Sequence, residues 1–169
     1  MYLTDKLRKS IFLSLCVIIA VALNYFESVF FISGVIPGIK IGISNIVILT
    51  VIYFFSFKEA ILISILKTLL VTLLFGNGVS FLYSLFGGLV SALGMSVFKN
   101  LKGLSSIGVS MIGGFLHISV QIITAYIILD SVTVFYYYPY MLSVSICTGF
   151  INGLIVMSLL KKLKSERRF

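Results

Sequence analysis

Six long apolar runs are the feature that most limits how this chain can fold. They cover about residues 9–26, 41–57, 59–75, 79–98, 104–129 and 134–160. A helix needs about 20 apolar residues, rising about 1.5 Å each, to cross the hydrocarbon core of a bilayer. With 60% of its residues hydrophobic and only 11% charged, the chain lacks the polar surface of a soluble domain. We therefore expect an all-α, polytopic membrane protein, a single membrane domain over residues 1–169 built as a six-transmembrane-helix bundle.

Two parts of this expectation have alternatives. The second run is the shortest and begins with polar residues, so five spans plus a re-entrant second segment form the alternative to six spans. The first run resembles an export signal, because the basic "LRKS" precedes it and Ala20-Val21-Ala22 has the small-x-small pattern of a cleavage site. Since the apolar run continues to Phe26, we expect it to be retained as a span.

Basic residues gather at one end of the predicted bundle. With six spans, both termini share a side with the connections at 56–59 and 99–103. That side holds eleven of the thirteen basic residues, namely Lys6, Arg8, Lys9, Lys58, Lys99, Lys102, Lys161, Lys162, Lys164, Arg167 and Arg168. Because Lys and Arg favour cytoplasmic loops, we expect both termini in the cytoplasm and the protein in the cell membrane. The net charge of +8 is then a topology signal, and we expect no nucleic-acid partner.

The cysteines and the histidine do not indicate a metal or redox site. Cys16 and Cys147 both fall within apolar runs, where a thiol behaves as a small hydrophobic group. One histidine and two cysteines do not match the usual ligand spacing of a metal cluster. We expect no disulfide, no metal site and no cofactor.

Small residues recur at helical spacing in three of the runs. The rows are Ser84, Gly88, Ala92 and Ser96 in the fourth run, Ser145, Gly149 and Gly153 in the sixth, and Ser10, Ser14 and Ala20 in the first. In lipid, such rows let helix backbones approach closely. We expect them to pack the bundle internally, and a docking face for another membrane subunit is the alternative.

Polar residues within the runs indicate a binding site. Lys67 lies in the middle of the third run, and His117 and Gln121 share one face of the fifth. Helical rise places Lys67 and Gln121 about 12 Å, and His117 about 18 Å, below the outer ends of their spans. Lys40 and Asn45 lie at the outer end of the second run. Because ionisable groups are costly in a membrane, we predict that these five residues line a cavity open to the outside.

Each of these residues also has a plainer explanation. The Lys67 ammonium could snorkel to the interface along its aliphatic stem. His117 could simply bond a backbone carbonyl of a neighbouring helix. Asn24 and Glu27 close the first run at the same outer surface, which favours the cavity.

Three segments resemble a known family. "PGIKIGISNIVIL" (37–49), "LLFGNGVSFLYSLFGGLVS" (73–91) and "GGFLHISVQ" (113–121) are similar to the Gx transporter family, also labelled heptaprenyl diphosphate synthase component I. This family is related to the substrate-binding S components of energy-coupling factor (ECF) transporters. His117 and Gln121 match its Gly-Gly-x-x-His-Asn-x-x-Gln pattern, whereas Ile118 replaces the Asn and Lys67 stands near a usual Arg.

The resemblance implies a six-helix S-component fold with a small-molecule site near the outer face. It also implies a transmembrane T subunit and two cytoplasmic ATPases as partners, with Ser10, Ser14 and Ala20 of the first span in the docking surface. The sequence contains no Walker A motif, so energy for transport would come from partners or from a gradient.

The sequence therefore favours a transporter subunit that binds a vitamin-like, flavin-like or isoprenoid or quinone-precursor solute. A prenyl diphosphate synthase would need clustered aspartates to hold magnesium, and the chain has only Asp5 and Asp130, at opposite predicted faces. We expect no enzyme activity. A non-catalytic scaffold subunit of a redox or isoprenoid/quinone assembly is the alternative.

Overall fold

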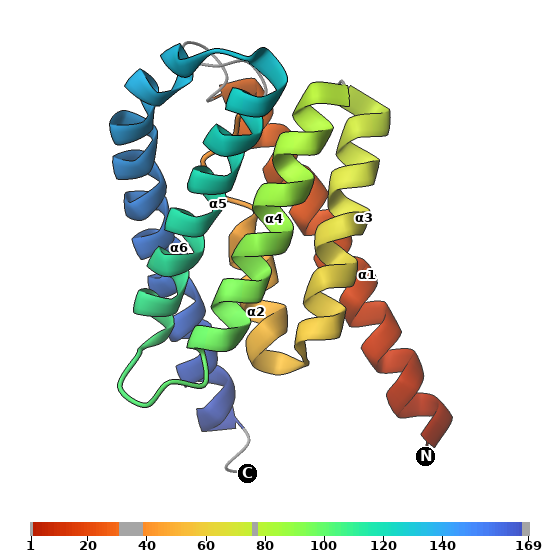
Figure 1. The fold of residues 1–169 in the computed structure, drawn as a ribbon. Helices are drawn as coiled ribbons and strands as arrows, with labels where there is room; N and C mark the ends of the chain where they lie inside the picture. Colours follow the sequence, from red (N-terminus) through yellow and green to blue (C-terminus); the bar gives the residue numbers. More distant parts are fainter. Residues whose placement is uncertain (1, 31–38, 76–77, 167–169) are drawn as a thin grey trace.

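The computed structural model describes residues 2–30, 39–75 and 78–166, and within these ranges all regular structure is helical. The elements are α1 (Tyr2–Phe30), α2 (Asn45–Phe54), α3 (Phe57–Phe75), α4 (Gly78–Phe98), α5 (Ser106–Leu129), the 3₁₀ helix η1 (Val132–Tyr137) and α6 (Tyr138–Glu166). They form one bundle in which α1 begins and α6 ends at the same end (Figure 1). We call this the terminal end, and the opposite one the distal end.

Four of these helices are long and apolar enough to cross a bilayer. They are Lys6–Ser28, Gly78–Phe98, Ser106–Leu129 and Val132–Lys162. The chain is thus a polytopic helical membrane protein, which confirms the coarse expectation from the sequence. The 19 residues of α3 would extend about 28 Å, but this helix carries Lys58, Glu59 and Lys67. Length and composition alone therefore do not mark α3 as a span.

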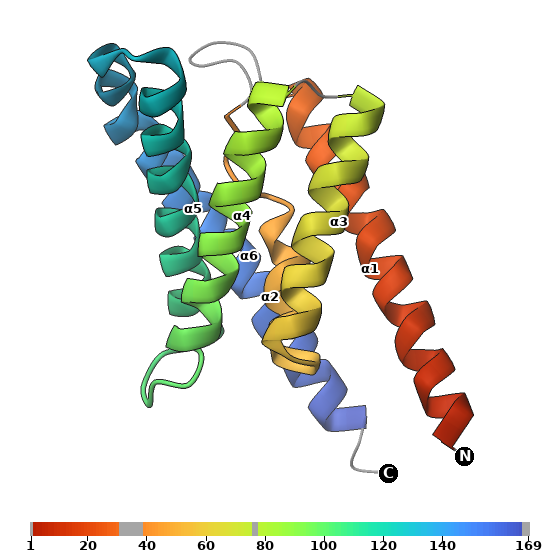
Figure 2. The same ribbon diagram turned by 45° about the vertical axis from the view of Figure 1, so that its right-hand side comes forward.

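The expected helix over residues 41–57 is wrong for the first part of that range. The helix α2 has only 10 residues, or about 15 Å, and residues 39–44 before it are not helical. We call residues 39–44 the unwound segment. Gly42 has a φ of +93°, in the left-handed region that favours glycine and interrupts a right-handed helix. The segment and α2 together run from the distal half of the bundle to the terminal end (Figure 2).

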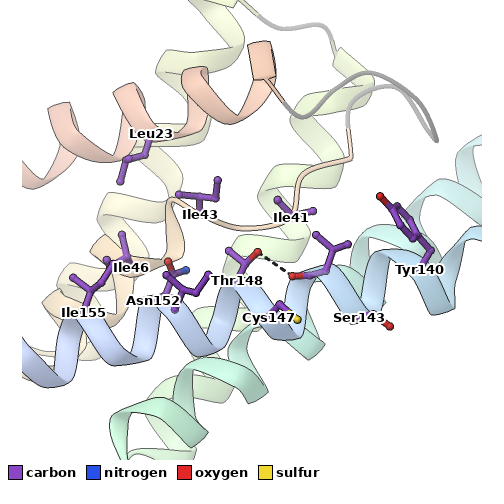
Figure 3. A pocket seen from close by; sticks show the side chains of 12 residues that line it. Leu23, Ile41, Ile43, Ile46, Tyr140, Ser143, Cys147, Thr148, Asn152 and Ile155 are labelled. Carbon is purple, nitrogen blue, oxygen red and sulfur yellow. Dashed lines mark hydrogen bonds between the residues drawn. The ribbon is translucent and has the colours of Figure 1, made fainter.

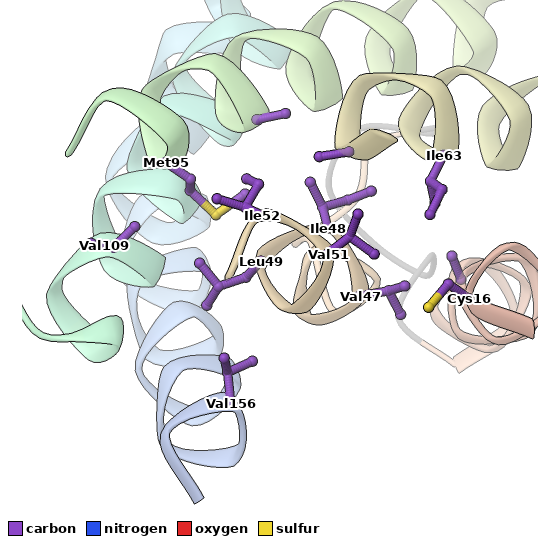
Figure 4. Packing of buried hydrophobic residues seen from close by; sticks show 13 residues of the cluster. Cys16, Val47, Ile48, Leu49, Val51, Ile52, Ile63, Met95, Val109 and Val156 are labelled. Carbon is purple, nitrogen blue, oxygen red and sulfur yellow. The ribbon is translucent and has the colours of Figure 1, made fainter. Parts of the chain in front are cut away.

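The short helix α2 forms the centre of the hydrophobic core. Apart from Asn45 and Thr50 its side chains are hydrophobic all round the helix, and Val47, Ile48 and Leu49 are buried. Figure 4 shows the other helices around it, with Cys16 of α1 and Val156 of α6 facing it from different directions. Because α2 is enclosed by protein, the chain can leave helical structure just before it without exposing backbone to lipid.

Rows of small residues pack α6 against α5, as expected. A Cβ added at Gly149 would lie 2.9 Å from the carbonyl oxygen of Ser110, and one at Gly153 would lie 2.5 Å from the Cα of Ile107. At Gly114 of α5 the added Cβ would lie 2.6 Å from the carbonyl oxygen of Ser145. These backbones approach too closely for any larger residue.

Replacing Gly114 by alanine should destabilise the protein, because the new methyl group meets backbone that cannot move independently. Overpacking of this kind costs about 1–3 kcal/mol, so the thermal unfolding midpoint should fall by roughly 2–10 °C in a chain of this size. The matched control is Gly78→Ala, where no atom lies within 4 Å of the added Cβ. Equal midpoints for the two variants would contradict the close contact between α5 and α6.

The row on α1 follows the expected internal packing only in part. Ala20 is completely buried within the core, so it packs inside the bundle and has no surface to offer a partner. Ser10 and Ser14 are exposed, among the exposed apolar side chains Ile11, Leu15 and Ile18.

Candidate functional site

The structure brings all five predicted site residues together around the unwound segment. Lys40 lies within it, Asn45 is the first residue of α2, Lys67 comes from α3, and His117 and Gln121 come from α5. All five side chains are buried, with Lys67 1% exposed and Gln121 0% exposed. Their role in binding a solute stays a prediction, but their convergence from four separate segments forms one polar cluster inside an apolar bundle.

Gln121 pairs with the backbone of Lys40. Its Oε1 accepts a hydrogen bond of 2.9 Å from the Lys40 amide, and its Nε2 donates one of 2.7 Å to the Lys40 carbonyl. The amide side chain therefore replaces the partner that a helix or sheet would provide. In this conformation both of its hydrogen-bonding atoms are occupied by the chain itself.

Glu27 of α1 holds the next residues of the unwound segment. Its Oε1 accepts from the amide of Gly42 at 2.7 Å, and its Oε2 accepts from the amide of Ile43 at 3.2 Å. Only 2% of Glu27 is exposed. Backbone amides that bond a buried carboxylate stabilise its charge, so this glutamate is bound as an anchor for the segment.

The carbonyl groups of the segment are bonded by α6. The Ser145 hydroxyl donates to the carbonyl of Ile41 at 3.2 Å, and Asn152 Nδ2 donates to the carbonyl of Gly42 at 3.1 Å. Side chains from α1, α5 and α6 thus satisfy backbone groups that a bilayer could not. The polar residues thus hold an irregular piece of backbone inside the bundle.

The two lysines of the cluster bond neutral oxygen atoms. Lys40 Nζ donates to Asn24 Oδ1. Lys67 Nζ donates to Ser44 Oγ at 2.7 Å and to Asn45 Oδ1 at 3.4 Å. The Glu27 carboxylate acts electrostatically on both lysines.

His117 lies between the unwound segment and α4. An added Cβ at Gly42 would lie 3.3 Å from His117 Cδ2, and one at Gly87 would lie 3.1 Å from His117 Nδ1. Within the described part of the chain, His117 Nδ1 and Asn45 Nδ2 are buried without hydrogen-bond partners. Two glycines therefore make room for an imidazole whose hydrogen-bonding capacity is not fully used.

Sequence reasoning missed several members of this cluster. From the sequence, Glu27 is placed at the outer surface near the cavity without a partner, Ser145 is expected only to pack helices, and Asn152 is not singled out. Asn152 did carry a signal, because an amide within a long apolar run needs a buried partner. Nothing in the sequence indicated that the partners would be backbone groups of residues 41–43.

An apolar groove of about 570 Å³ lies between α1 and α6, with the unwound segment and the start of α2 as its floor (Figure 3). Leu23, Ile43 and Ile155 are among its lining residues. The hydroxyl of Thr148 there is bonded within α6, to the carbonyl of Val144. None of the five predicted site residues lines this groove, and Asn152 is shared by the groove and the polar cluster.

These features define a class of protein: a polytopic helical membrane protein with an unwound segment inside the bundle, held by buried polar side chains. Residues 16–159 match the family described as heptaprenyl diphosphate synthase component I. Because the match covers most of the chain, the protein belongs to this family, and the resemblance seen in the sequence is confirmed. The comparisons found no match among curated proteins and none among solved structures.

Proposed function

We propose that this protein is the substrate-binding S subunit of an ECF-type transporter. The observation that carries the proposal is the unwound segment at the centre of the bundle, surrounded by Glu27, Lys40, Lys67 and His117. Ionisable residues inside a membrane protein usually mark a substrate or ion path. Interrupted transmembrane helices commonly form solute sites in transporters.

The proposal includes an orientation. Eleven of the thirteen basic residues belong to the two terminal parts of the chain, to the first turn of α3 or to the connection between α4 and α5. The positive-inside rule then assigns the terminal end to the cytoplasm and the distal end to the outside of the cell membrane. A solute would reach the unwound segment from the distal end, in the six-helix arrangement of an S component.

Energy for transport would come from partner subunits. The sequence has no Walker A motif to bind ATP, so we propose a transmembrane T subunit and two cytoplasmic ATPases. Ser10 and Ser14, exposed on α1, are the proposed docking residues. Vitamin-like, flavin-like and isoprenoid or quinone-precursor solutes are the proposed classes, taken from the resemblance to S components.

A non-catalytic scaffold in a redox or isoprenoid/quinone assembly is the second candidate function. The family description, which names a component of a prenyl diphosphate synthase, and the apolar groove between α1 and α6 favour it. Catalysis by the chain itself is not proposed. Asp5 lies in α1 near the terminal end and Asp130 follows α5 at the distal end, whereas magnesium diphosphate chemistry uses acidic residues close together.

Co-purification tests the transporter against the scaffold. The tagged protein, co-expressed with a T subunit and its ATPases and cross-linked in native membranes, should retain all three. Ser14→Phe should reduce their recovery at least several-fold, because a bulky ring prevents close helix contact. Ser158→Phe, at an exposed serine of α6, is the matched control and should retain them. Recovery of redox or prenyl-transfer enzymes in their place would support the scaffold.

A further inference from the structure

Acidic residues are too few to balance the buried lysines. The whole chain has five, namely Asp5, Glu27, Glu59, Asp130 and Glu166. Asp5 and Glu166 lie in the end turns of α1 and α6, and Glu59 forms an ion pair with Lys9. Asp130 is exposed where α5 ends at the distal end. Glu27 is therefore the one carboxylate within the polar cluster.

Two buried lysines share this carboxylate, so the cluster carries one excess positive charge. Glu27 is already bound by two backbone amides, and Lys67 bonds only the neutral oxygens of Ser44 and Asn45. A buried charge is normally paired, because the protein interior solvates it poorly. An ammonium group also has three donors, and two of those of Lys67 are used.

Several groups around Lys67 favour a negatively charged hydrogen-bond acceptor at this place. The helix α2 starts here, and the positive end of its dipole adds to the excess charge. Ser44 makes no capping bond to this helix, and its hydroxyl accepts from Lys67. Asn45 Nδ2 is a buried donor without a hydrogen-bond partner in the described part of the chain. A Cβ added at Gly42 would lie 2.9 Å from this nitrogen.

We propose that the solute carries a single negative charge, as a carboxylate does, and that Lys67 and Asn45 bind this group at the start of α2. The inference rests on the proposed solute-binding function and names the chemistry of that same site. One negative charge balances the excess of the cluster. A diphosphate would bring several negative charges to a site that can balance one, so this inference favours carboxylates over diphosphates.

A mutant cycle tests the missing charge without any ligand. Ser44→Asp supplies a carboxylate to Lys67, and Ser44→Asn is the uncharged control of the same size. In detergent or nanodiscs, Ser44→Asp should unfold about 5 °C above Ser44→Asn. In a Lys67→Met background this difference should disappear, which separates pairing with Lys67 from capping of α2. Equal midpoints for Ser44→Asp and Ser44→Asn in the otherwise wild-type protein would overturn the proposal.

Small probes test binding directly. Benzoate and butyrate at millimolar concentration should raise the unfolding midpoint of the protein, whereas benzamide, butyramide and inorganic pyrophosphate should not. Lys67→Met should lose the response, and Lys58→Met, at an exposed lysine of α3, should keep it. Stabilisation by the amides or by pyrophosphate to the same degree would overturn the proposal.

The two proposals can fail separately. Anion-specific stabilisation without recovery of a T subunit would support the carboxylate site and overturn the transporter. Recovery of the T subunit and ATPases, with no coupling between Ser44→Asp and Lys67 and no response to carboxylates, would support the transporter and overturn the carboxylate site.

Discussion

Replacing Glu27 by alanine should cause the largest loss of stability of any single change considered for this protein. The variant leaves the buried amide of Gly42 and the half-buried amide of Ile43, each now bonded to the carboxylate, without that partner. Each stranded group costs about 1–3 kcal/mol. The change also removes the one negative charge that acts on Lys40 and Lys67. We expect the thermal unfolding midpoint of the purified protein to fall by more than roughly 10 °C.

The matched control is Glu59→Ala. That carboxylate pairs with Lys9 at the terminal end, where a solvent-exposed pair contributes about 0–1 kcal/mol. Glu27→Gln keeps one acceptor oxygen without the charge and should fall between the two. If Glu27→Ala does not fold at all, the yield of folded Glu27→Gln relative to Glu59→Ala provides the comparison. Similar stability for all three variants would show that Glu27 does not anchor the unwound segment.

Gln121→Leu should cause the second-largest loss of stability. Leucine fills similar space but bonds neither the amide nor the carbonyl of Lys40, so two buried groups lose their partners. At about 1–3 kcal/mol each, the loss should lower the unfolding midpoint by roughly 5–15 °C. Hydrogen exchange should locate the damage, because the Lys40 amide should exchange much faster in the variant.

Asn100→Leu is the control for this change, since it places leucine at an exposed amide beyond α4. It should leave both the midpoint and the exchange of residues 39–44 unchanged. Gln121→Glu keeps an acceptor for the Lys40 amide, whereas its carboxylate cannot donate to the Lys40 carbonyl. It should therefore lower the midpoint but protect the Lys40 amide from exchange better than Gln121→Leu does. Unchanged protection of Lys40 in Gln121→Leu would contradict the two-way pairing.

Much of the candidate site could be predicted from single residues. Lys67 and His117 stand out in apolar runs because a membrane tolerates ionisable groups only where protein surrounds them. Helical rise alone gives the approximate depth of each residue below the outer end of its span. The roles of Glu27 and Asn152 were harder to predict, because both side chains bond backbone groups. Backbone groups occur at every residue, so the sequence does not indicate which of them will be the partner.

The sequence by itself determined that the chain is a membrane protein, roughly where its long helices begin and end, and which side chains must turn away from lipid. These properties follow from local hydrophobicity and from the fixed geometry of a helix. Only the tertiary structure decided that residues 39–44 are unwound and that Gln121, Ser145 and Asn152 hold them. Each of those bonds joins groups at least 81 residues apart in the chain, and a helix at 39–44 would have satisfied the same backbone locally. Whether residues 39–44 are helical or unwound therefore depends on hydrogen-bond partners that only the assembled bundle provides.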